Sequence, residues 1–341
     1  MMLKKEWIKQ GFIDEPVAEG TDLKADIRRM AKEKDAIILA HYYTIGDIQN
    51  VADFVGDSLA LARKAAETDA KMMVMCGVHF MAETCKLLSP DKIVLCPDLN
   101  AGCSLADSCK AEDLKKYKEE HPGYQVISYV NTTAAVKALT DVVVTSGNAK
   151  KVVDQLPKDA KLIFGPDYNL GNYINEVTGR KMLLWNGGCH VHERFSVAKI
   201  VELKQQYPDA VVMAHLECKG PVLALADVKG STATMLQYAQ QSDKKQFIVA
   251  TEAGILHEMQ RTCPDKEFIP VPPEISEGLR VGEQGSGMSG LECSCNECQY
   301  MKMNSLLKIY NALKYEWPSV EIDPKVAKEA VKPIERMLEL S

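Results

Sequence analysis

The chain has 341 residues, of which 46% are hydrophobic and 26% are charged, and its 41 basic and 47 acidic residues give a net charge of −6. This composition is typical of a soluble globular protein of two or three domains, and the scattered Lys and Arg residues argue against nucleic-acid binding. The N-terminus lacks the apolar core of a signal peptide, and no apolar run reaches membrane-spanning length, so we expect a cytoplasmic protein without a membrane partner.

Helices alternate with apolar strands along most of the chain. A helix over 23–33, with apolar positions that repeat every 3.6 residues, precedes AIILA, which is apolar on both faces as buried parallel strands are. Helices over 111–121 and 197–208 precede similar strands, QVISYV and AVVMAH. Further strands, with a helix between the members of each pair, are expected at 71–77 and 92–96, 161–166 and 181–185, and 247–252 and 267–271. A helix over 300–314 and one over 324–340 end the chain.

Three segments, 36–66, 125–155 and 210–240, repeat one pattern. Each has an apolar run, a polar triplet, a helical stretch and a second apolar turn that ends in Ser or Thr. A period of about ninety residues is too long for a solenoid and predicts three α/β domains, each a parallel sheet between two layers of helices. We expect the domains to be related by a pseudo-threefold axis, with the active site at their junction. The expected domains are 1–109 with an N-terminal extension, 110–196, and 197–341 with a Gly-rich loop and C-terminal helices.

One cysteine follows the fourth strand of each repeat. Cys103 and Cys189 come 62 and 60 residues after the first polar residue of their repeats, and Cys298 comes 83 residues after it because its repeat contains a loop insertion. Three thiolates on a pseudo-threefold axis are one ligand short of a closed four-cysteine site. They suit a [4Fe–4S] cluster with one open iron, which acts as a Lewis acid.

The other cysteines have different predicted roles. Most are predicted to be small buried hydrophobic residues, namely Cys76, Cys85, Cys96, Cys218 and Cys263. The roles of Cys109 and Cys293 stay open. The local spacing C-x-C-x-x-C at 293–298 allows a zinc site as an alternative, although no second pair of cysteines lies nearby in the sequence.

Polar side chains at the ends of the repeated strands predict one common cavity, because ligands bind beyond the carboxyl ends of parallel strands. They supply two imidazoles, two phenols, an amide and a carboxylate, from His41, Tyr43, Tyr129, Asn131, His215 and Glu217. Such groups suit proton transfer on a polar substrate. His192 comes three residues after Cys189 and is expected near the same metal. For any single histidine the alternative is a structural hydrogen bond.

Short polar segments are predicted to begin a helix in each repeat. They are Asp57-Ser58, Ser146-Gly147 and Gly230-Ser231-Thr232. Helix N-termini that face a cavity bind phosphate and carboxylate groups, although a plain N-cap is the alternative for each of them. The glycine-rich segment GSGMSG at 285–290 is expected to be a flexible lid.

Several long motifs resemble the quinolinate synthase family, the iron–sulfur enzymes of NAD biosynthesis. They are LAHYYTIGDIQNVADFVGDSL, GVHFMAETCKLLSPDKIVLCPDLNAGCSLADSC, WNGGCHVHERF, AHLEC, GSTATM and CSCNECQYMKMN, and the likeness extends over nearly the whole chain from about residue 20. The resemblance implies three α/β domains around a central cluster held by Cys103, Cys189 and Cys298. It also implies substrate contacts from His41, Tyr43, Ser58, Tyr129, Asn131, Ser146, His192, His215, Glu217, Ser231 and Thr232.

The resemblance further implies a transferase that condenses iminoaspartate with dihydroxyacetone phosphate and releases phosphate and two waters. Functional coupling to the enzyme that supplies iminoaspartate would follow. We assign Glu217 as general base, with Tyr43, His192 and Tyr129 as the other catalytic groups. Some relatives carry C-x-x-C-x-x-C where this chain has C-x-C-x-x-C, so a redox role for Cys293 and Cys295 stays open.

Two other functions remain as alternatives. One is an iron–sulfur hydro-lyase that acts on another hydroxy acid. The other is a non-enzymatic iron–sulfur redox sensor, which would need an output surface such as a basic patch or an appended helix-turn-helix, and the sequence contains neither.

Overall fold

The computed structural model describes residues 3–273 and 296–341 and divides into two compact units. The first unit consists of Met1–Cys189 with Gln299–Ser341, and the second is His190–Cys298. Cys293 and Cys295, whose redox role was left open, and the expected lid GSGMSG lie outside the described residues.

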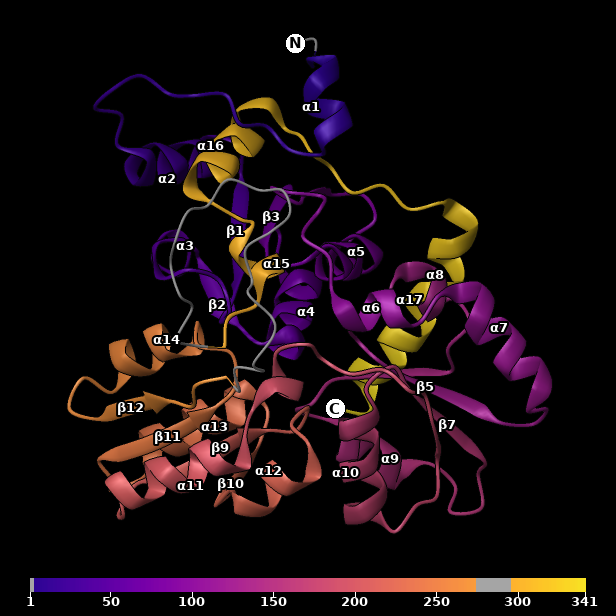
Figure 1. Cartoon of the computed structure of the whole chain (residues 1–341). Helices are drawn as coiled ribbons and strands as arrows, with labels where there is room; N and C mark the ends of the chain where they lie inside the picture. The colour runs from indigo at the N-terminus through magenta and orange to yellow at the C-terminus, as the bar shows by residue number, and fades with distance from the viewer. Residues whose placement is uncertain (1–2, 274–295) are drawn as a thin grey trace. The chain divides into compact units, whose positions relative to one another are not determined.

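Three four-stranded sheets form the framework, two in the first unit and one in the second (Figure 1). Their orders are β2-β1-β3-β4, β6-β5-β7-β8 and β10-β9-β11-β12, and all neighbouring strands are parallel. This confirms the predicted α/β class with three parallel sheets. The strands are β1 Ala36–His41, β2 Phe54–Gly56, β3 Met72–Cys76, β4 Ile93–Leu95, β5 Gln125–Tyr129, β6 Val142–Val144, β7 Leu162–Gly165, β8 Leu183–Leu184, β9 Val211–His215, β10 Val228–Gly230, β11 Gln246–Ala250 and β12 Glu267–Pro270.

Helices connect the strands of each sheet, as parallel strands require. Those of the first unit are α1 Lys5–Gln10, α2 Leu23–Glu33, α3 Gly46–Val51, α4 Ser58–Glu67, α5 His79–Leu88, α6 Ser104–Ser108, α7 Ala111–Glu120, α8 Ala134–Lys137, α9 Ala149–Gln155, α10 Tyr168–Thr178, α15 Gln299–Lys302, α16 Leu306–Tyr315 and α17 Pro324–Glu339. The second unit has α11 Val197–Gln206, α12 Gly220–Leu225, α13 Thr232–Gln241, α14 Ile255–Thr262 and the 3₁₀ turn η1 His192–Arg194. Within the described residues, no helix combines the length and apolar character needed to cross a membrane.

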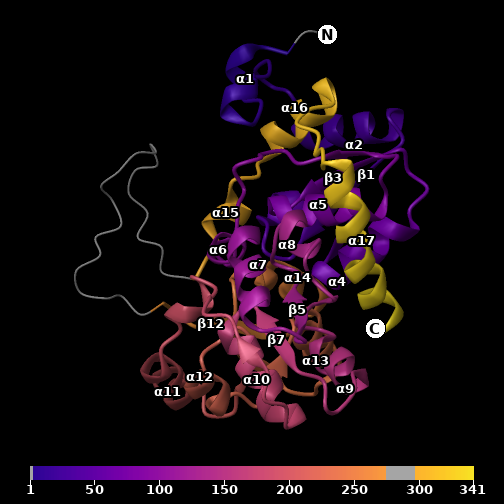
Figure 2. The ribbon, with the colours of Figure 1, turned by 90° about the vertical axis from the view of Figure 1, so that its right-hand side faces the viewer.

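The C-terminal helices pack on the two sheets of the first unit. Helix α16 lies beside α2 (Figures 1 and 2), and its Ile309 and Leu313 share a buried core with Ile38 of β1. Helix α17 packs on α8 and β6, and Arg336 donates a 3.2 Å hydrogen bond to the carbonyl oxygen of Asp141. The predicted domain boundaries remain a prediction.

Two predicted helix boundaries were wrong for identifiable reasons. Ser146 does not begin a helix: α9 starts at Ala149, because the Asn148 side chain accepts from the amide of Thr145 at 2.6 Å and closes a turn there. The helix expected over 300–314 is broken into α15 and α16. The break falls at Ser305, whose hydroxyl caps α16 by accepting from the amide of Lys308.

The register of the strands confirms the repeated pattern at atomic detail. His41 pairs with Gly56, Tyr129 with Val144, and His215 with Gly230, so the first two strands of each sheet end at equivalent residues. Ser58, Ser146 and Thr232 each come two residues beyond the second strand's partner residue. Each repeat therefore presents a strand-end residue and a hydroxyl at the same edge of its sheet.

In every repeat, an aspartate shortly before the second strand forms hydrogen bonds with the backbone of the first strand. The carboxylates of Asp53, Asp141 and Asp227 accept from the backbone amides of Ile38, Val126 and Val212 at 2.7, 2.7 and 2.9 Å. The backbone amides of the three aspartates donate back to the carbonyls of the same residues, each at 2.9 Å. This two-way link ties the turn before the second strand to the first strand.

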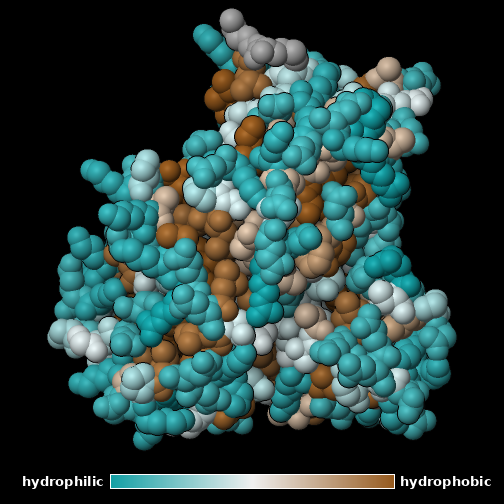
Figure 3. Space-filling model, turned by 180° about the vertical axis from the view of Figure 1, so that it is seen from behind, coloured by the Kyte–Doolittle hydropathy of each residue, from teal (hydrophilic) through white to brown (hydrophobic). Residues whose placement is uncertain are grey.

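Hydrophilic residues cover much of the face seen in Figure 3, with hydrophobic residues visible between them. The core consists of aliphatic, methionine and phenylalanine side chains from the strands, such as Val74, Met75, Ile127 and Phe247, all at 0% exposure. A sheet with fully apolar strands must be covered on both faces, which fits the helices that flank each one.

Candidate active site

The described cysteines fall into two classes by burial. Six are buried, and three, Cys103, Cys189 and Cys298, are partly exposed. All five cysteines predicted to be core residues belong to the buried class, and the sixth is Cys109.

Burial separates the thiols by how readily they ionise, which matters because the thiolate and not the thiol binds metal. Loss of hydration raises the pKa of Cys85, Cys96 and Cys109 to about 12, and it raises the pKa of Cys76 as well. These thiols stay protonated at neutral pH. The partly exposed class coincides with the three predicted cluster ligands.

Local structure positions two of these cysteines. Cys103 is the N-cap residue of α6, in the loop that follows β4. Cys298 is held through its backbone: its amide donates a 3.0 Å hydrogen bond to Oε1 of Glu252. The other carboxylate oxygen of Glu252 accepts from the amide of Gly254 at 2.7 Å, and the carbonyl of Asn296 accepts from Ala253.

Glu252 was not identified from the sequence. It is fully buried, yet its carboxylate is satisfied by backbone amides from two separate segments of the second unit. The available signal was its place directly beyond the third strand of its sheet, at the same edge as the polar triplets. The polar site residues expected from the sequence came from the ends of the first and second strands, and the cysteines from the segment after the fourth strand, so the third strand supplied none.

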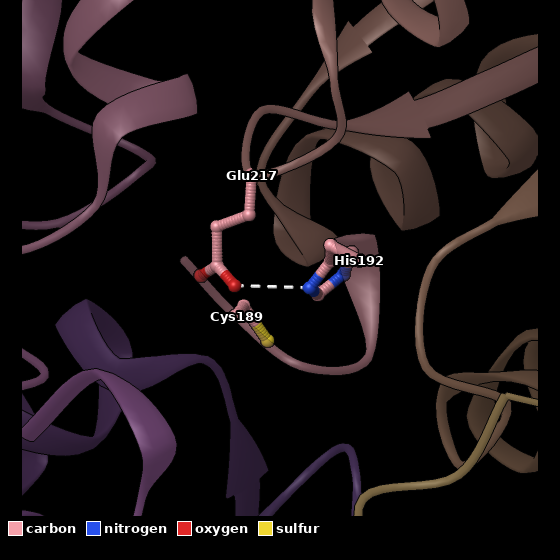
Figure 4. A group of neighbouring side chains, drawn as sticks. All are labelled: Cys189, His192 and Glu217. Carbon is pink, nitrogen blue, oxygen red and sulfur yellow. Dashed lines mark ion pairs between the residues drawn. The ribbon is translucent and has the colours of Figure 1, made fainter. Parts of the chain in front are cut away.

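In the second unit, His192 is the centre of a polar cluster. Its Nδ1 lies 2.9 Å from Oε2 of Glu217 (Figure 4), and its Nε2 lies 2.9 Å from the hydroxyl of Thr251. The ring of His215 stacks on that of His192 with centroids 4.8 Å apart. Nδ1 of His215 accepts from the backbone amide of Glu217 at 3.3 Å.

The surroundings of His215 keep its imidazole neutral. Burial lowers its pKa to about 4, against the opposing attraction of Glu217, and the charge of His192 lowers it further. With Nδ1 accepting from a backbone amide, the neutral ring carries its proton on Nε2. His215 can therefore donate a hydrogen bond from Nε2 at neutral pH.

Cys189 closes the first unit only three residues before His192, so the chain itself holds its thiol near the histidine. One ligand atom each from Cys189, His192 and Glu217 lie within 4.8 Å of one another (Figure 4). Thiolate, imidazole and carboxylate are donors that bind transition metals such as zinc and iron. This group could hold a metal ion.

In the first unit, His41 and Tyr43 lie in contact at the end of β1. Their rings meet edge to face with centroids 4.6 Å apart, and Nδ1 of His41 accepts from the backbone amide of Tyr43 at 3.1 Å. Lys302 donates a 2.8 Å hydrogen bond to the carbonyl of Tyr43. His41 is buried, whereas Tyr43 is half-buried.

The remaining predicted residues lie at strand ends or helix starts. Tyr129 is the buried last residue of β5, and Asn131, two residues later, is half-buried. Ser58 is the first residue of α4, which Asp57 caps by accepting from Ala60. Ser231 caps α13 by accepting from the amide of Thr234 at 3.2 Å.

Comparisons with known proteins agree with the resemblance found in the sequence. The family model described as Quinolinate synthetase A protein matches residues 25–339. The chain belongs to this family.

Relatives named quinolinate synthase are similar over nearly their whole length. The one from Rippkaea orientalis is 50% identical over 320 residues, and the one from Nostoc punctiforme is 51% identical over 320, each alignment covering 94% of both chains. The one from Chloroherpeton thalassium is 50% identical over 320 residues, which cover 94% of this chain and 95% of the relative.

The residues that the likeness to quinolinate synthases assigned to the substrate are divided between the two units. Ser146 lies in the turn before α9, and Thr232 is the first residue of α13. The first unit supplies His41, Tyr43, Ser58, Tyr129, Asn131 and Ser146, and the second supplies His192, His215, Glu217, Ser231 and Thr232. Within their own units, the structure brings together His41 with Tyr43, and His192 with His215 and Glu217.

Proposed function

We propose that this chain catalyses the quinolinate synthase reaction, in which iminoaspartate and dihydroxyacetone phosphate condense to quinolinate with release of phosphate and two waters. The family match over residues 25–339 supports this reaction. The structural observation that carries the proposal is that, among the nine cysteines of the described chain, only the three predicted ligands are partly exposed.

Cys103, Cys189 and Cys298 would hold a [4Fe–4S] cluster. Residues that neighbour Cys103 and Cys298 in the sequence lie close together: a Cβ atom added at Gly102 would lie 3.5 Å from the ring of Tyr300. Gly102 precedes Cys103, and Tyr300 follows Cys298 by two residues. When bound through three cysteines, the cluster offers one open iron that polarises a hydroxyl group of the substrate as a Lewis acid.

Anionic groups of the substrates would bind at the helix starts. Helices α4 and α13 each have ten residues, and Ser58, Ser231 and Thr232 place hydroxyl groups at their first turns. Backbone amides and the helix dipole at such ends favour phosphate and carboxylate groups. Ser146 adds a hydroxyl from a turn in the second sheet.

Glu217 is the proposed general base, and His192 is its proton-transfer partner. The 2.9 Å contact between them lets His192 Nδ1 donate to the carboxylate, while Thr251 fixes the opposite ring nitrogen. A base whose orientation is fixed in this way accepts a proton from a substrate carbon or nitrogen without reorganising. Tyr43 and Tyr129 supply phenol groups for further proton transfer.

Exclusion of water protects the reaction, because an imine such as iminoaspartate hydrolyses readily. His41, Tyr129, His215 and Glu217 are exposed by 6, 5, 3 and 4%. Because this substrate is unstable, we propose coupling to the enzyme that produces iminoaspartate, and we keep the cytoplasmic location expected from the sequence as part of the proposal.

The test is anaerobic. Iron and sulfide content and quinolinate formation are measured for C103S, C189S and C298S, with Cys85→Ala and Cys263→Ala as controls at buried thiols. We expect the three serine variants to lose iron and activity and the two controls to keep both. Full iron content in any serine variant would overturn the ligand assignment, and iron-loaded unsubstituted protein that forms no quinolinate would overturn the reaction.

A further inference from the structure

A buried polar side chain occupies the same position in the first two repeats. Gln49 comes eight residues after His41, and Lys137 comes eight residues after Tyr129, each within the short helix that follows the first strand. Gln49 is 5% exposed and Lys137 is fully buried. The third repeat has Leu223 at this position, in α12, eight residues after His215.

Both side chains bridge the loop that leaves the strand. Nε2 of Gln49 donates to the carbonyls of Tyr42 and Thr44, at 2.9 and 2.8 Å. The residue between these two carbonyls is Tyr43, a proposed catalytic group.

Lys137 makes the matching contacts in the second repeat. Its Nζ donates to the carbonyl of Val130 at 2.8 Å and to the carbonyl of Thr132. A weaker contact of 3.4 Å joins it to the hydroxyl of Thr132. The residue between the two carbonyls is Asn131, a proposed substrate ligand.

Packing alone does not account for these residues. A buried ammonium or amide loses its hydration, and a leucine fills the same position in the third repeat without that cost. The cost for Lys137 is visible in its pKa, which burial lowers to about 8 although Glu83 and Cys103 act in the opposite direction. In both repeats the buried donor binds two carbonyl groups, one before and one after a functional residue.

We propose that Gln49 and Lys137 are positioning residues that hold the Tyr43 and Asn131 loops in the conformation that binds substrate. One anchored carbonyl lies in the peptide unit before the central residue and the other in the unit after the next residue, so both ends of the short loop are held and the direction of the central side chain is restricted. The inference rests on the proposed function, because that function gives Tyr43 and Asn131 their roles.

Substitution of each donor by methionine tests the clamp, because methionine keeps the volume and removes the hydrogen bonds. With substrates in steady state, we expect Lys137→Met to raise KM about tenfold with kcat within about threefold, since Asn131 binds substrate. Gln49→Met should also lower kcat, because Tyr43 takes part in proton transfer. Leu223→Met is the matched control and should leave KM and kcat within about twofold.

Lys137→Gln separates the clamp from the charge. This variant puts glutamine, the residue found at the equivalent position 49 of the first repeat, in place of Lys137. We expect its KM to lie within about threefold of that of the unsubstituted protein, unlike the KM of Lys137→Met. If Lys137→Gln were as impaired as Lys137→Met, the effect would belong to the positive charge beside Glu83 and Cys103, and the clamp would be refuted.

Hydrogen exchange gives a readout that does not depend on activity. The amides of Thr44 and Thr132 donate within their loops, to His41 and Val130, at 3.0 and 2.8 Å. Both should exchange at least about fivefold faster in the methionine variant of their own repeat only. Unchanged exchange and KM in folded variants would overturn the inference. Absence of quinolinate formation by the unsubstituted protein would refute the proposed function instead, and exchange would still decide the clamp.

Discussion

Replacing Glu252 by glutamine should loosen the segment that carries Cys298. The carboxylate accepts two backbone amide hydrogen bonds, of 3.0 Å from Cys298 and 2.7 Å from Gly254. Glutamine turns one of these acceptors into a donor that faces an amide donor. Hydrogen bonds to a charged acceptor contribute about 1.5–3 kcal/mol each, so we expect a loss of about 2 kcal/mol.

A loss of that size changes the equilibrium between the docked and undocked segment about 30-fold, because 1.36 kcal/mol corresponds to a factor of ten. If Cys298 is a cluster ligand, undocking removes one of three thiolates. The iron of the reconstituted protein should therefore pass to a chelator at least about ten times faster in the variant than in the unsubstituted protein.

The assay is anaerobic transfer of iron to a coloured chelator, followed by absorbance. Glu258→Gln is the matched control in the same unit, since Glu258 pairs with Arg261 at 2.6 Å on α14. The control should release iron at a rate within about twofold of the unsubstituted protein. Equal rates for Glu252→Gln and the unsubstituted protein would refute the reasoning that this carboxylate secures Cys298.

Three further predictions concern single carboxylates. Glu217→Gln should still bind both substrates but lower kcat at least about 100-fold, measured by anaerobic quinolinate formation, because a general base contributes about 10²–10⁴. Asp141→Ala should lower the free energy of unfolding by about 1–2 kcal/mol in urea titrations, since Val126 loses a partner at 2.7 Å. Hydrogen bonding, first from Tyr315 and then from Lys314, lowers the pKa of Glu15 to about 2. The ionised Glu15 therefore contributes fully to the stability of the folded protein above pH 4.5, and this contribution is lost as the pH falls towards 2. Glu15→Gln should thus cost about 1 kcal/mol at pH 7, after allowance for solvent screening, and progressively less below pH 4.5.

Each of these has a clear contrary result. Near-normal kcat in Glu217→Gln would remove it as the base. An unchanged urea midpoint in Asp141→Ala would mean that the two-way aspartate link contributes nothing to stability. A difference between Glu15→Gln and the unsubstituted protein that stays constant from pH 7 to pH 3 would show that the charge of Glu15 is not the source of its effect.

The spacing of apolar residues correctly predicted the helices and strands that pack on one core. The helix over 23–33 has the bounds expected from its apolar spacing, and α14 lies between the third and fourth strands of its sheet as expected. The break at Ser305 and the delayed start of α9 were missed because a side chain that accepts a backbone amide overrides the local apolar pattern there.

The buried polar contacts were harder to predict. Gln49, Lys137 and Glu252 are polar residues that a single sequence would place at the surface. Only the fold shows that their donors and acceptors meet backbone groups at strand ends. The repeat did contain a signal for two of them, since both stand eight residues beyond a strand end, but the third copy has leucine there and obscures it.

The presence of leucine at position 223 of the third repeat has a physical explanation. Glu217 stands two residues after the end of its strand, as Tyr43 and Asn131 do in the other repeats. Its side chain is oriented by a 2.9 Å contact with His192, and its amide donates to His215. A charge-assisted hydrogen bond of this kind fixes direction by itself. The loop of the third repeat therefore has less need of anchored carbonyls, and an apolar residue at this position avoids the cost of burying a donor. The amide of the central residue donates to the strand-end histidine in the first and third repeats alike. On the proposal above, the third repeat differs in that an ion pair with His192 replaces the buried donor of the short helix.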